Sequence, residues 1–146
     1  MPIIQLEHHP EYLDEVVKLE YDFDRDTWVY WDIVDSTLIS VRERILYRMI
    51  CDYQHFINII GTNTADWYLY AVPENGWMKI AGVYVKKESR RKWIAEKLIM
   101  ELKRKTSKTL MSQIDAKNEA SIQLHRKLWF DLYMQSPWFF DTYLFR

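Results

Sequence analysis

The chain has 146 residues, of which 49% are hydrophobic, and a net charge of −1; this composition is that of one folded domain and excludes a disordered chain. Its one cysteine, Cys51, excludes an internal disulfide, and no stretch approaches the roughly 18 consecutive apolar residues of a membrane-spanning helix. The N-terminus lacks the basic and apolar segments of a signal peptide, so we expect a reducing, cytoplasmic location without membrane contact.

The first third of the chain predicts one strand and two helices. The helices are indicated by apolar residues three and four positions apart, and by Pro10 at a helix start. In chain order, the elements are a strand at Pro2–Leu6, a helix at His9–Glu20, an irregular acidic and aromatic segment at Tyr21–Val34, and a helix that is capped by Ser36 and ends near Tyr53.

The rest of the chain predicts a sheet with two further helices. Three strands, His55–Ile60, Trp67–Val72 and Trp77–Lys87, are joined by short turns and predict an antiparallel meander. Gly82 lies inside the third of these strands, which indicates a β-bulge or a close backbone approach. The remaining elements are a helix from Arg91, a strand at Thr109–Ile114, a helix from an Asn118 cap to Leu128, and a last strand or hairpin at Trp138–Phe145.

Positive charge is concentrated in one segment of an otherwise acidic chain. Between Lys86 and Lys108 there are ten Lys and Arg residues against three Glu. Such clustering fits a local phosphate site, and it fits equally well a solvated helix face with its flanking turn. No His, Cys and Asp set stands at metal-ligand spacing, so we predict no metal site.

Two segments in the second half have a recognisable pattern. The first follows the third strand of the meander and reads Val85-Lys86-Lys87-Glu88-Ser89-Arg90-Arg91-Lys92-Trp93-Ile94-Ala95. The second reads Asn118-Glu119-Ala120-Ser121-Ile122-Gln123-Leu124-His125-Arg126-Lys127-Leu128-Trp129-Phe130. Both resemble signatures of the GNAT superfamily of acyl-CoA N-acyltransferases. The matching positions are Arg90 and Ala95 in the first segment, and Asn118, Leu124, Leu128 and Phe130 in the second.

This resemblance covers about Lys79–Phe130 and extends to the rest of the chain by element order. It implies one GNAT-like domain over residues 1–146, of the α/β class, with a mixed, mostly antiparallel sheet flanked by helices. It also implies a cofactor, acetyl-CoA. The cofactor-binding residues expected from the resemblance are Tyr84, Val85, Arg90, Arg91, Lys92, Trp93, Ile94, Ala95 and Asn118.

The cofactor loop departs from the family pattern at Trp93, where the family has glycine. In the family, backbone N–H groups at this helix N-terminus point at the CoA pyrophosphate. A Trp93 side chain that points towards the pyrophosphate blocks the site, whereas one that turns away leaves the N–H groups able to serve. The sequence leaves both orientations open.

The resemblance also assigns catalytic roles. The backbone near Tyr84 and Val85 would polarise the acetyl carbonyl, and Glu88 is a candidate base for the amine. His125 stands where the family has the tyrosine that protonates the CoA thiolate, and histidine can also donate a proton. The alternative for His125 is a structural role, because its neighbours on the helix are apolar.

The acidic and aromatic stretch Tyr21–Val34 is the expected partner-binding segment. In the GNAT arrangement this region borders the acceptor site, where carboxylates beside Trp28, Tyr30 and Trp31 would bind an amine through charge and cation–π contact. Trp and Tyr are also favoured anchors of protein–protein contacts, so a protein partner is an equal alternative.

Three functions follow from these observations. The first is N-acetylation of an amine by acetyl-CoA. The second is a GNAT-derived binding or assembly protein that has lost the cofactor, such as a component of a phage virion; the residues Trp93, His125 and Trp129, which depart from the family pattern, favour it. The third, nucleic-acid binding, is disfavoured by the acidic net charge and the absence of a known motif. The sequence leaves an oligomer open.

Overall fold

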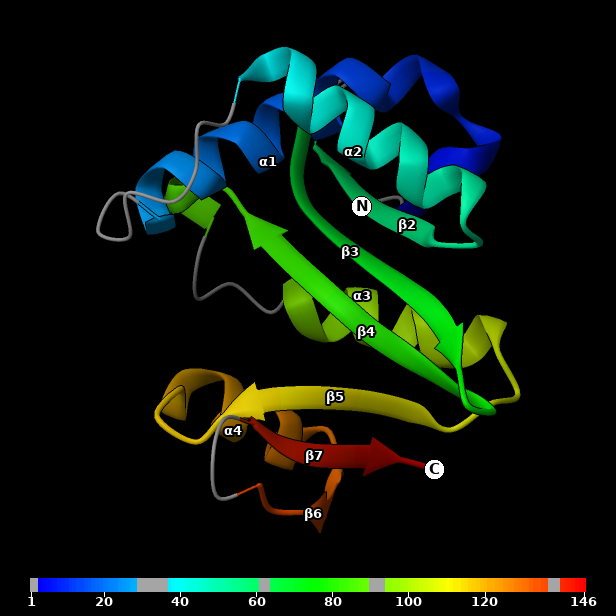
Figure 1. Ribbon diagram of the computed structural model, residues 1–146, viewed down its shortest axis with the longest axis vertical. Helices are drawn as coiled ribbons and strands as arrows, with labels where there is room; N and C mark the ends of the chain where they lie inside the picture. The colour runs from blue at the N-terminus through cyan, green and yellow to red at the C-terminus, as the bar shows by residue number, and fades with distance from the viewer. Residues whose placement is uncertain (1–2, 29–36, 61–63, 90–93, 137–139) are drawn as a thin grey trace.

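The computed structural model describes residues 3–28, 37–60, 64–89, 94–136 and 140–146 (Figure 1). The strands in this part are β1 (Ile3–Gln5), β2 (Gln54–Ile60), β3 (Thr64–Glu74), β4 (Trp77–Val85), β5 (Leu110–Asp115), β6 (Asp131–Met134) and β7 (Phe140–Phe145). The α-helices are α1 (Leu13–Trp28), α2 (Leu38–Ile50), α3 (Ile94–Lys105) and α4 (Glu119–Lys127), and short 3-10 turns lie at Leu6–His8, Pro10–Tyr12 and Lys87–Ser89.

The described strands form one sheet in the order β1-β2-β3-β4-β5-β7-β6. Neighbouring strands run antiparallel except β4 and β5, which run parallel. The helix α3 makes the crossover that a parallel pair requires. The predicted fold class, a single α/β domain with a mostly antiparallel sheet, is therefore confirmed.

Helices cover both faces of the sheet, and each face has its own core (Figure 1). The helices α1 and α2 pack on one face, where the buried residues include Leu6, Val16, Val17, Val41, Ile45, Ile57 and Tyr68. The helices α3 and α4 pack on the other face, where the buried residues include Phe56, Leu69, Ile94, Leu98, Leu102, Leu110 and Ile122. Because strand side chains alternate between faces, each strand of the meander contributes to both cores.

The first helix differs from its prediction at both ends. Residues 10–12 form a 3-10 turn, and α1 begins at Leu13 and runs to Trp28, so the prediction of an irregular segment from Tyr21 is wrong for its first eight residues. The apolar pattern stops near Glu20 because the next core-facing positions are the acidic residues Glu20 and Asp24, both buried. Residues 29–34 lie outside the described part.

The second helix begins with a capping box. Thr37, and not the predicted Ser36, accepts a hydrogen bond from the Ser40 amide at 3.0 Å, and the Ser40 hydroxyl accepts one from the Thr37 amide at 2.9 Å. These bonds satisfy two backbone donors that a bare helix start would leave open. The helix ends at Ile50, three residues before the predicted end, and Cys51 is a half-buried free thiol at its C-cap.

The predicted strands are confirmed with shifts of a few residues, and the last one is a hairpin of β6 and β7. The Asn118 cap is also confirmed, because its side chain accepts a hydrogen bond from the Ser121 amide at 3.2 Å. Within the described ranges, no helix is long and apolar enough to cross a membrane.

Candidate functional site

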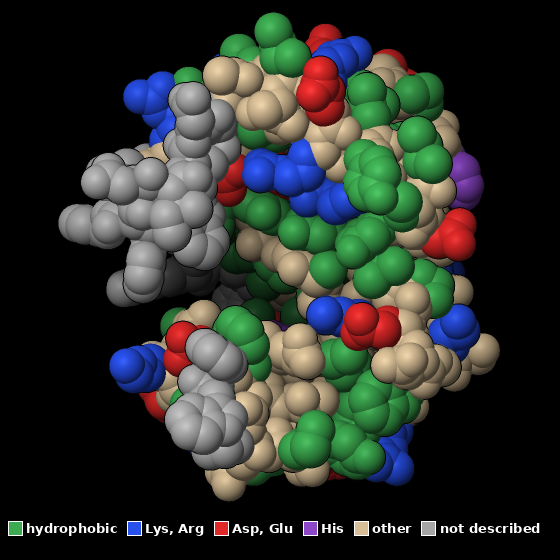
Figure 2. Space-filling view, in the orientation of Figure 1, with side chains coloured by type: hydrophobic (Ala, Val, Ile, Leu, Met, Phe, Trp, Pro, Cys, Tyr) green, Lys and Arg blue, Asp and Glu red, His purple; other side chains and the backbone are tan. Residues whose placement is uncertain are grey.

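The strands β4 and β5 separate in the middle of the sheet. They pair only at Met78 with Leu110 and at Lys79 with Met111, and then diverge (Figure 1). In the space-filling view the surface is hollowed between the part that holds α1, α2 and β3 and the part that holds β5 to β7 (Figure 2). One edge of β4 past Lys79 is therefore without a strand neighbour in the described structure, and its backbone groups are available to a ligand.

A β-bulge marks the start of this unpaired edge, as predicted from Gly82. Tyr70 pairs with Gly82, but the next residue of β3, Ala71, pairs with Ile80, so Ala81 is the extra residue. Gly82 is required here by its neighbour: a Cβ at this position would lie 2.3 Å from Cε1 of Tyr70. The tyrosine ring thus covers the bulge from the face that carries α1 and α2.

Beyond the bulge, Tyr84 and Val85 point to opposite faces. The Val85 side chain packs against the core beneath α3. The Tyr84 ring stacks on Tyr68 with centroids 4.8 Å apart and meets the edge of Phe23 at 4.7 Å. Burial raises the pKa of Tyr84, with a further contribution from the Glu20 carboxylate, so this phenol stays protonated.

The helix α3 is the next α-helix after the unpaired edge, and it begins at Ile94. Ile94 and Ala95 occupy its first turn with buried side chains, so their backbone N–H groups belong to a helix N-terminus, the end that attracts anions. Four of the predicted cofactor residues, Arg90, Arg91, Lys92 and Trp93, lie outside the described residues.

A cavity of about 370 Å³ lies where α1 meets the end of β4. Its lining residues are Lys18, Leu19, Asp22, Phe23, Arg25, Val85, Lys86 and Glu88. It thus brings the predicted base Glu88 and the predicted cofactor residue Val85 together with the acidic helix. His125 is not among the lining residues.

An ionic network, buried except at Arg44, joins α1 to α2. The Arg44 guanidinium donates to Glu20 at 2.8 Å and to Asp24 at 2.6 Å, and Arg48 donates to Glu20 at 2.6 Å. The Tyr68 hydroxyl also donates to Glu20. Glu20 and Asp24 are paired in this network, and Asp22 is the carboxylate among the described residues of α1 that lines the cavity.

His125 is buried on the opposite face of the sheet. Its Nε2 lies 3.0 Å from the Ser112 hydroxyl of β5, and its Nδ1 lies 2.7 Å from the Ser121 carbonyl oxygen. Its ring meets Phe130 edge-on at 4.7 Å. Burial lowers the pKa of His125, although the Ser121 carbonyl opposes this, so the neutral ring is favoured.

Trp129 stands at the end of α4, where the family pattern has glycine. The Phe130 amide donates to the His125 carbonyl at 2.9 Å, and the Trp129 amide donates to the Arg126 carbonyl at 3.1 Å, which together form a Schellman motif. Trp129 has a φ of 67° and is 85% exposed. Glycine would suit this position because the helix ends here with a left-handed residue. The presence of Trp129 in place of the family's glycine therefore does not bear on cofactor binding.

The basic segment has described residues both before α3 and in its last turn. Lys86 borders the cavity. Lys103, Arg104 and Lys105 form the last turn of α3, where positive charge interacts favourably with the negative end of the helix dipole. Arg104 donates to Glu101 at 2.6 Å, and Lys103 approaches two backbone carbonyls. This half of the segment is a solvated helix end, which fits the simpler of the two interpretations.

Comparison with known proteins places this architecture in a family. The family model described as acetyltransferase (GNAT) family matches residues 6–130. The chain belongs to the GNAT acetyltransferase family. A search of curated proteins by sequence finds no match.

Solved structures share the fold of this GNAT chain at low sequence identity. An aminoglycoside 6′-acetyltransferase type Ii is 16% identical with a TM-score of 0.77, over 99% of this chain and 96% of that one. The PaiA N-acetyltransferase from Thermoplasma acidophilum, in complex with coenzyme A, is 16% identical with a TM-score of 0.72, over 98% of each chain. An N-acetyltransferase from Staphylococcus aureus Mu50 is 20% identical with a TM-score of 0.70, over 99% and 98%.

The network of Glu20, Asp24, Arg44 and Arg48 was missed by the sequence reasoning. A signal for it exists, because the two acids are four residues apart on one helix and the two arginines are four apart on the next. Such pairs lie on one face of a helix and can interlock across a helix pair. In the described ranges, no group of His, Cys, Asp and Glu residues could hold a metal ion.

Proposed function

We propose that this GNAT protein is an N-acetyltransferase that transfers the acetyl group of acetyl-CoA to an amine. The observation that carries the proposal is the separation of β4 from β5 after Lys79. It leaves an unpaired strand edge on β4, and α3 is the next α-helix after that strand. Acetyl-CoA combines an amide-containing arm with a pyrophosphate, and these two features of the fold suit the two parts in order.

The residues proposed to hold the cofactor follow from this arrangement. The backbone of β4 from Gly82 to Val85 would bind the amide-containing arm, and the N–H groups at Ile94 and Ala95, with residues 90–93, would bind the pyrophosphate. When bound, the cofactor supplies an activated thioester. Asn118 caps α4 with its carboxamide oxygen, and its NH₂ group would be the donor for a contact with the cofactor.

The acceptor amine is proposed to enter through the cavity between α1 and the end of β4. Asp22 and Glu88 line this cavity together with Lys18, Arg25 and Lys86, and either carboxylate could pair with an ammonium group. Glu88 is exposed and lies in the turn that follows β4, so it is the proposed base that takes the ammonium proton. An accessible carboxylate is suited to pass that proton on to water.

The proposed role of His125 is positional. Both ring nitrogens already have partners in α4 and β5, and burial favours the neutral ring. A general acid for the thiolate would need a free N–H directed at the sulfur. We therefore favour the structural alternative, in which His125 joins α4 to β5.

The competing proposal, a GNAT-derived binding or assembly protein such as a virion component, rests on fewer departures from the family pattern than the sequence suggests. Trp129 is explained by its place at the end of α4, and His125 by its packing. Trp93 is then the departure on which the loss of acetyl-CoA would depend.

A thermal-shift titration with acetyl-CoA separates the two proposals. Binding to the native state raises its stability by about 2.7 kcal/mol when the ligand reaches 100 times its dissociation constant. We expect a rising melting temperature in the wild type, with 3′-phospho-ADP, which lacks the amide-containing arm, as a weaker control ligand. No shift in the wild type at about 1 mM acetyl-CoA, a concentration that saturates any micromolar site, would overturn the proposal. A shift that appears only in Trp93→Gly would assign the loss to that side chain.

A further inference from the structure

The helix α2 has two apolar stripes on opposite sides. Val41 and Ile45 lie on the buried side, against the core beneath the helix. Ile39, Leu46 and Ile50 are seven and four residues apart and lie on the outer side, where Ile39 is 71% and Ile50 is 81% exposed. A helix that is apolar on both sides normally lies between two packed layers. The outer stripe therefore indicates a second contact.

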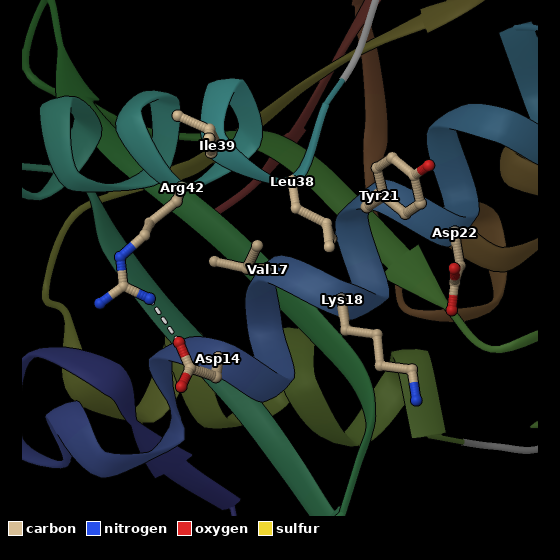
Figure 3. A pocket seen from close by; sticks show the side chains of 8 residues that line it. All are labelled: Asp14, Val17, Lys18, Tyr21, Asp22, Leu38, Ile39 and Arg42. Carbon is tan, nitrogen blue, oxygen red and sulfur yellow. Dashed lines mark hydrogen bonds and ion pairs between the residues drawn. The ribbon is translucent and has the colours of Figure 1, made fainter.

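A groove lies beside one end of this stripe, between α1 and α2 (Figure 3). Its volume is about 410 Å³. Val17, Leu38 and Ile39 form its apolar part, the Asp14–Arg42 ion pair stands at one end, and Lys18, Tyr21 and Asp22 stand at the other (Figure 3). Ile39 thus belongs both to the stripe and to the groove.

The opposite end of the stripe carries the matching projection. Ile50, at the last position of α2, is the most exposed of the aliphatic side chains in the described residues. Ile39 and Ile50 are eleven residues apart, which is about 16 Å along a helix at 1.5 Å per residue. A surface with a projection at one end and a recess at the other is complementary to itself when two copies lie antiparallel, because a two-fold axis exchanges the ends.

Polar residues along the helix fit the same antiparallel pairing. An axis midway between Ile39 and Ile50 sets Glu43 of one copy opposite Leu46 of the other and one residue from its Tyr47, whose exposed phenol can donate to the carboxylate. Asp52, exposed just past Ile50, would then approach Lys18 at the far end of the partner's groove, and Lys18 makes no ion pair within the described part of the chain. The first pair would form a hydrogen bond and the second an ion pair, so both would favour the antiparallel contact.

We propose that this chain forms a two-fold dimer through α2, in which Ile50 of each copy packs into the groove between α1 and α2 of its partner. The contact of one helix and one groove per copy is at the small end of specific interfaces, so the dimer should dissociate in the micromolar range. The groove shares Lys18 and Asp22 with the proposed acceptor cavity, so each partner's helix end would border that cavity. The dimer itself does not depend on the proposed activity.

Sedimentation velocity of the full chain from about 1 to about 200 µM tests the dimer, because this range spans micromolar dissociation constants. We expect a reversible monomer–dimer equilibrium in the wild type. Ile39→Glu and Ile50→Glu should each raise the dissociation constant at least about tenfold, since each buries a charge in the contact. Met100→Glu, at a half-exposed apolar position on α3 on the other face of the sheet, is the matched control and should leave it unchanged.

Disulfide cross-linking tests the antiparallel arrangement separately. In a Cys51→Ser background, a mixture of the Ile39→Cys and Ile50→Cys chains should cross-link faster than either chain alone, because the two-fold axis sets position 39 beside position 50 of the partner. Preferential linking of Ile39→Cys to itself would overturn the proposed axis. A wild type that stays monomeric at the highest concentration would overturn the dimer. If that monomer binds lipid vesicles and Ile50→Glu abolishes the binding, the stripe would instead be assigned to a lipid surface.

Discussion

Replacing Trp129 by glycine should make this protein more stable. The residue holds a φ of 67° in a Schellman motif, and a non-glycine residue in that region costs about 1–2 kcal/mol relative to a right-handed conformation. Since the side chain is 85% exposed, its removal gives up little packing. Glycine also makes the unfolded chain more flexible, which takes back about 0.4–1 kcal/mol. The net expectation is a gain of about 1 kcal/mol.

Urea unfolding and calorimetry would measure this gain. For a chain of this length, about 1 kcal/mol corresponds to a rise of roughly 2–4 °C in melting temperature. Trp129→Ala is the matched control, because it removes the same indole but keeps the unfavourable φ, and we expect it to lie within about 0.5 kcal/mol of the wild type. The difference between the two variants isolates the backbone term.

The reasoning would be refuted by a Trp129→Gly chain that is no more stable than Trp129→Ala. Destabilisation of both variants by a similar amount would show instead that the indole makes a contact that its exposure does not reveal. Either result would also weaken the inference that the missing glycine at this position concerns helix termination and has no bearing on acetyl-CoA.

Three further predictions concern the cores on the two faces of the sheet. Glu20→Ala leaves the buried guanidinium of Arg48 without its carboxylate and should lower the free energy of unfolding in urea by about 3–5 kcal/mol; a loss below about 1 kcal/mol would contradict the burial of the network. Gly82→Ala sets a Cβ against the Tyr70 ring and should cost about 1–3 kcal/mol, and the cost should shrink in a Tyr70→Ala background. Burial lowers the pKa of His125 below its ordinary 6.5, so the unfolded chain takes up the proton first as the pH falls. Stability is therefore lost below about pH 6.5, by at most about 1.4 kcal/mol per pH unit. The variant His125→Gln should flatten this pH dependence, and an unchanged slope would contradict the prediction.

The fold was largely predictable from the sequence because most elements keep a clean period. The meander of β2, β3 and β4 alternates between its two cores, and Gly82 marks the bulge. The cap of α4 at Asn118 follows directly from residue type. These features are local, so the pattern of neighbouring residues is enough to specify them.

Tertiary pairing explains what the sequence reasoning missed. The helix α1 continues past Glu20 because Arg44 and Arg48, twenty or more residues away, neutralise its buried acids. The cavity beside Glu88 forms only when α1 packs against the end of β4. Contacts between residues so distant in sequence produce no hydrophobic periodicity within a single segment. The acidic residues of α1 therefore suggested an exposed binding surface, although two of them are buried.

Hydrogen exchange with and without acetyl-CoA tests most directly whether the unpaired edge of β4 holds the cofactor. The account predicts slower exchange for amides of Gly82–Val85 and for Ile94 and Ala95, with little change in β6 and β7, which lie at the far side of the sheet. Protection that is absent, or that falls only outside β4 and the start of α3, would contradict the proposed acetyl-CoA site.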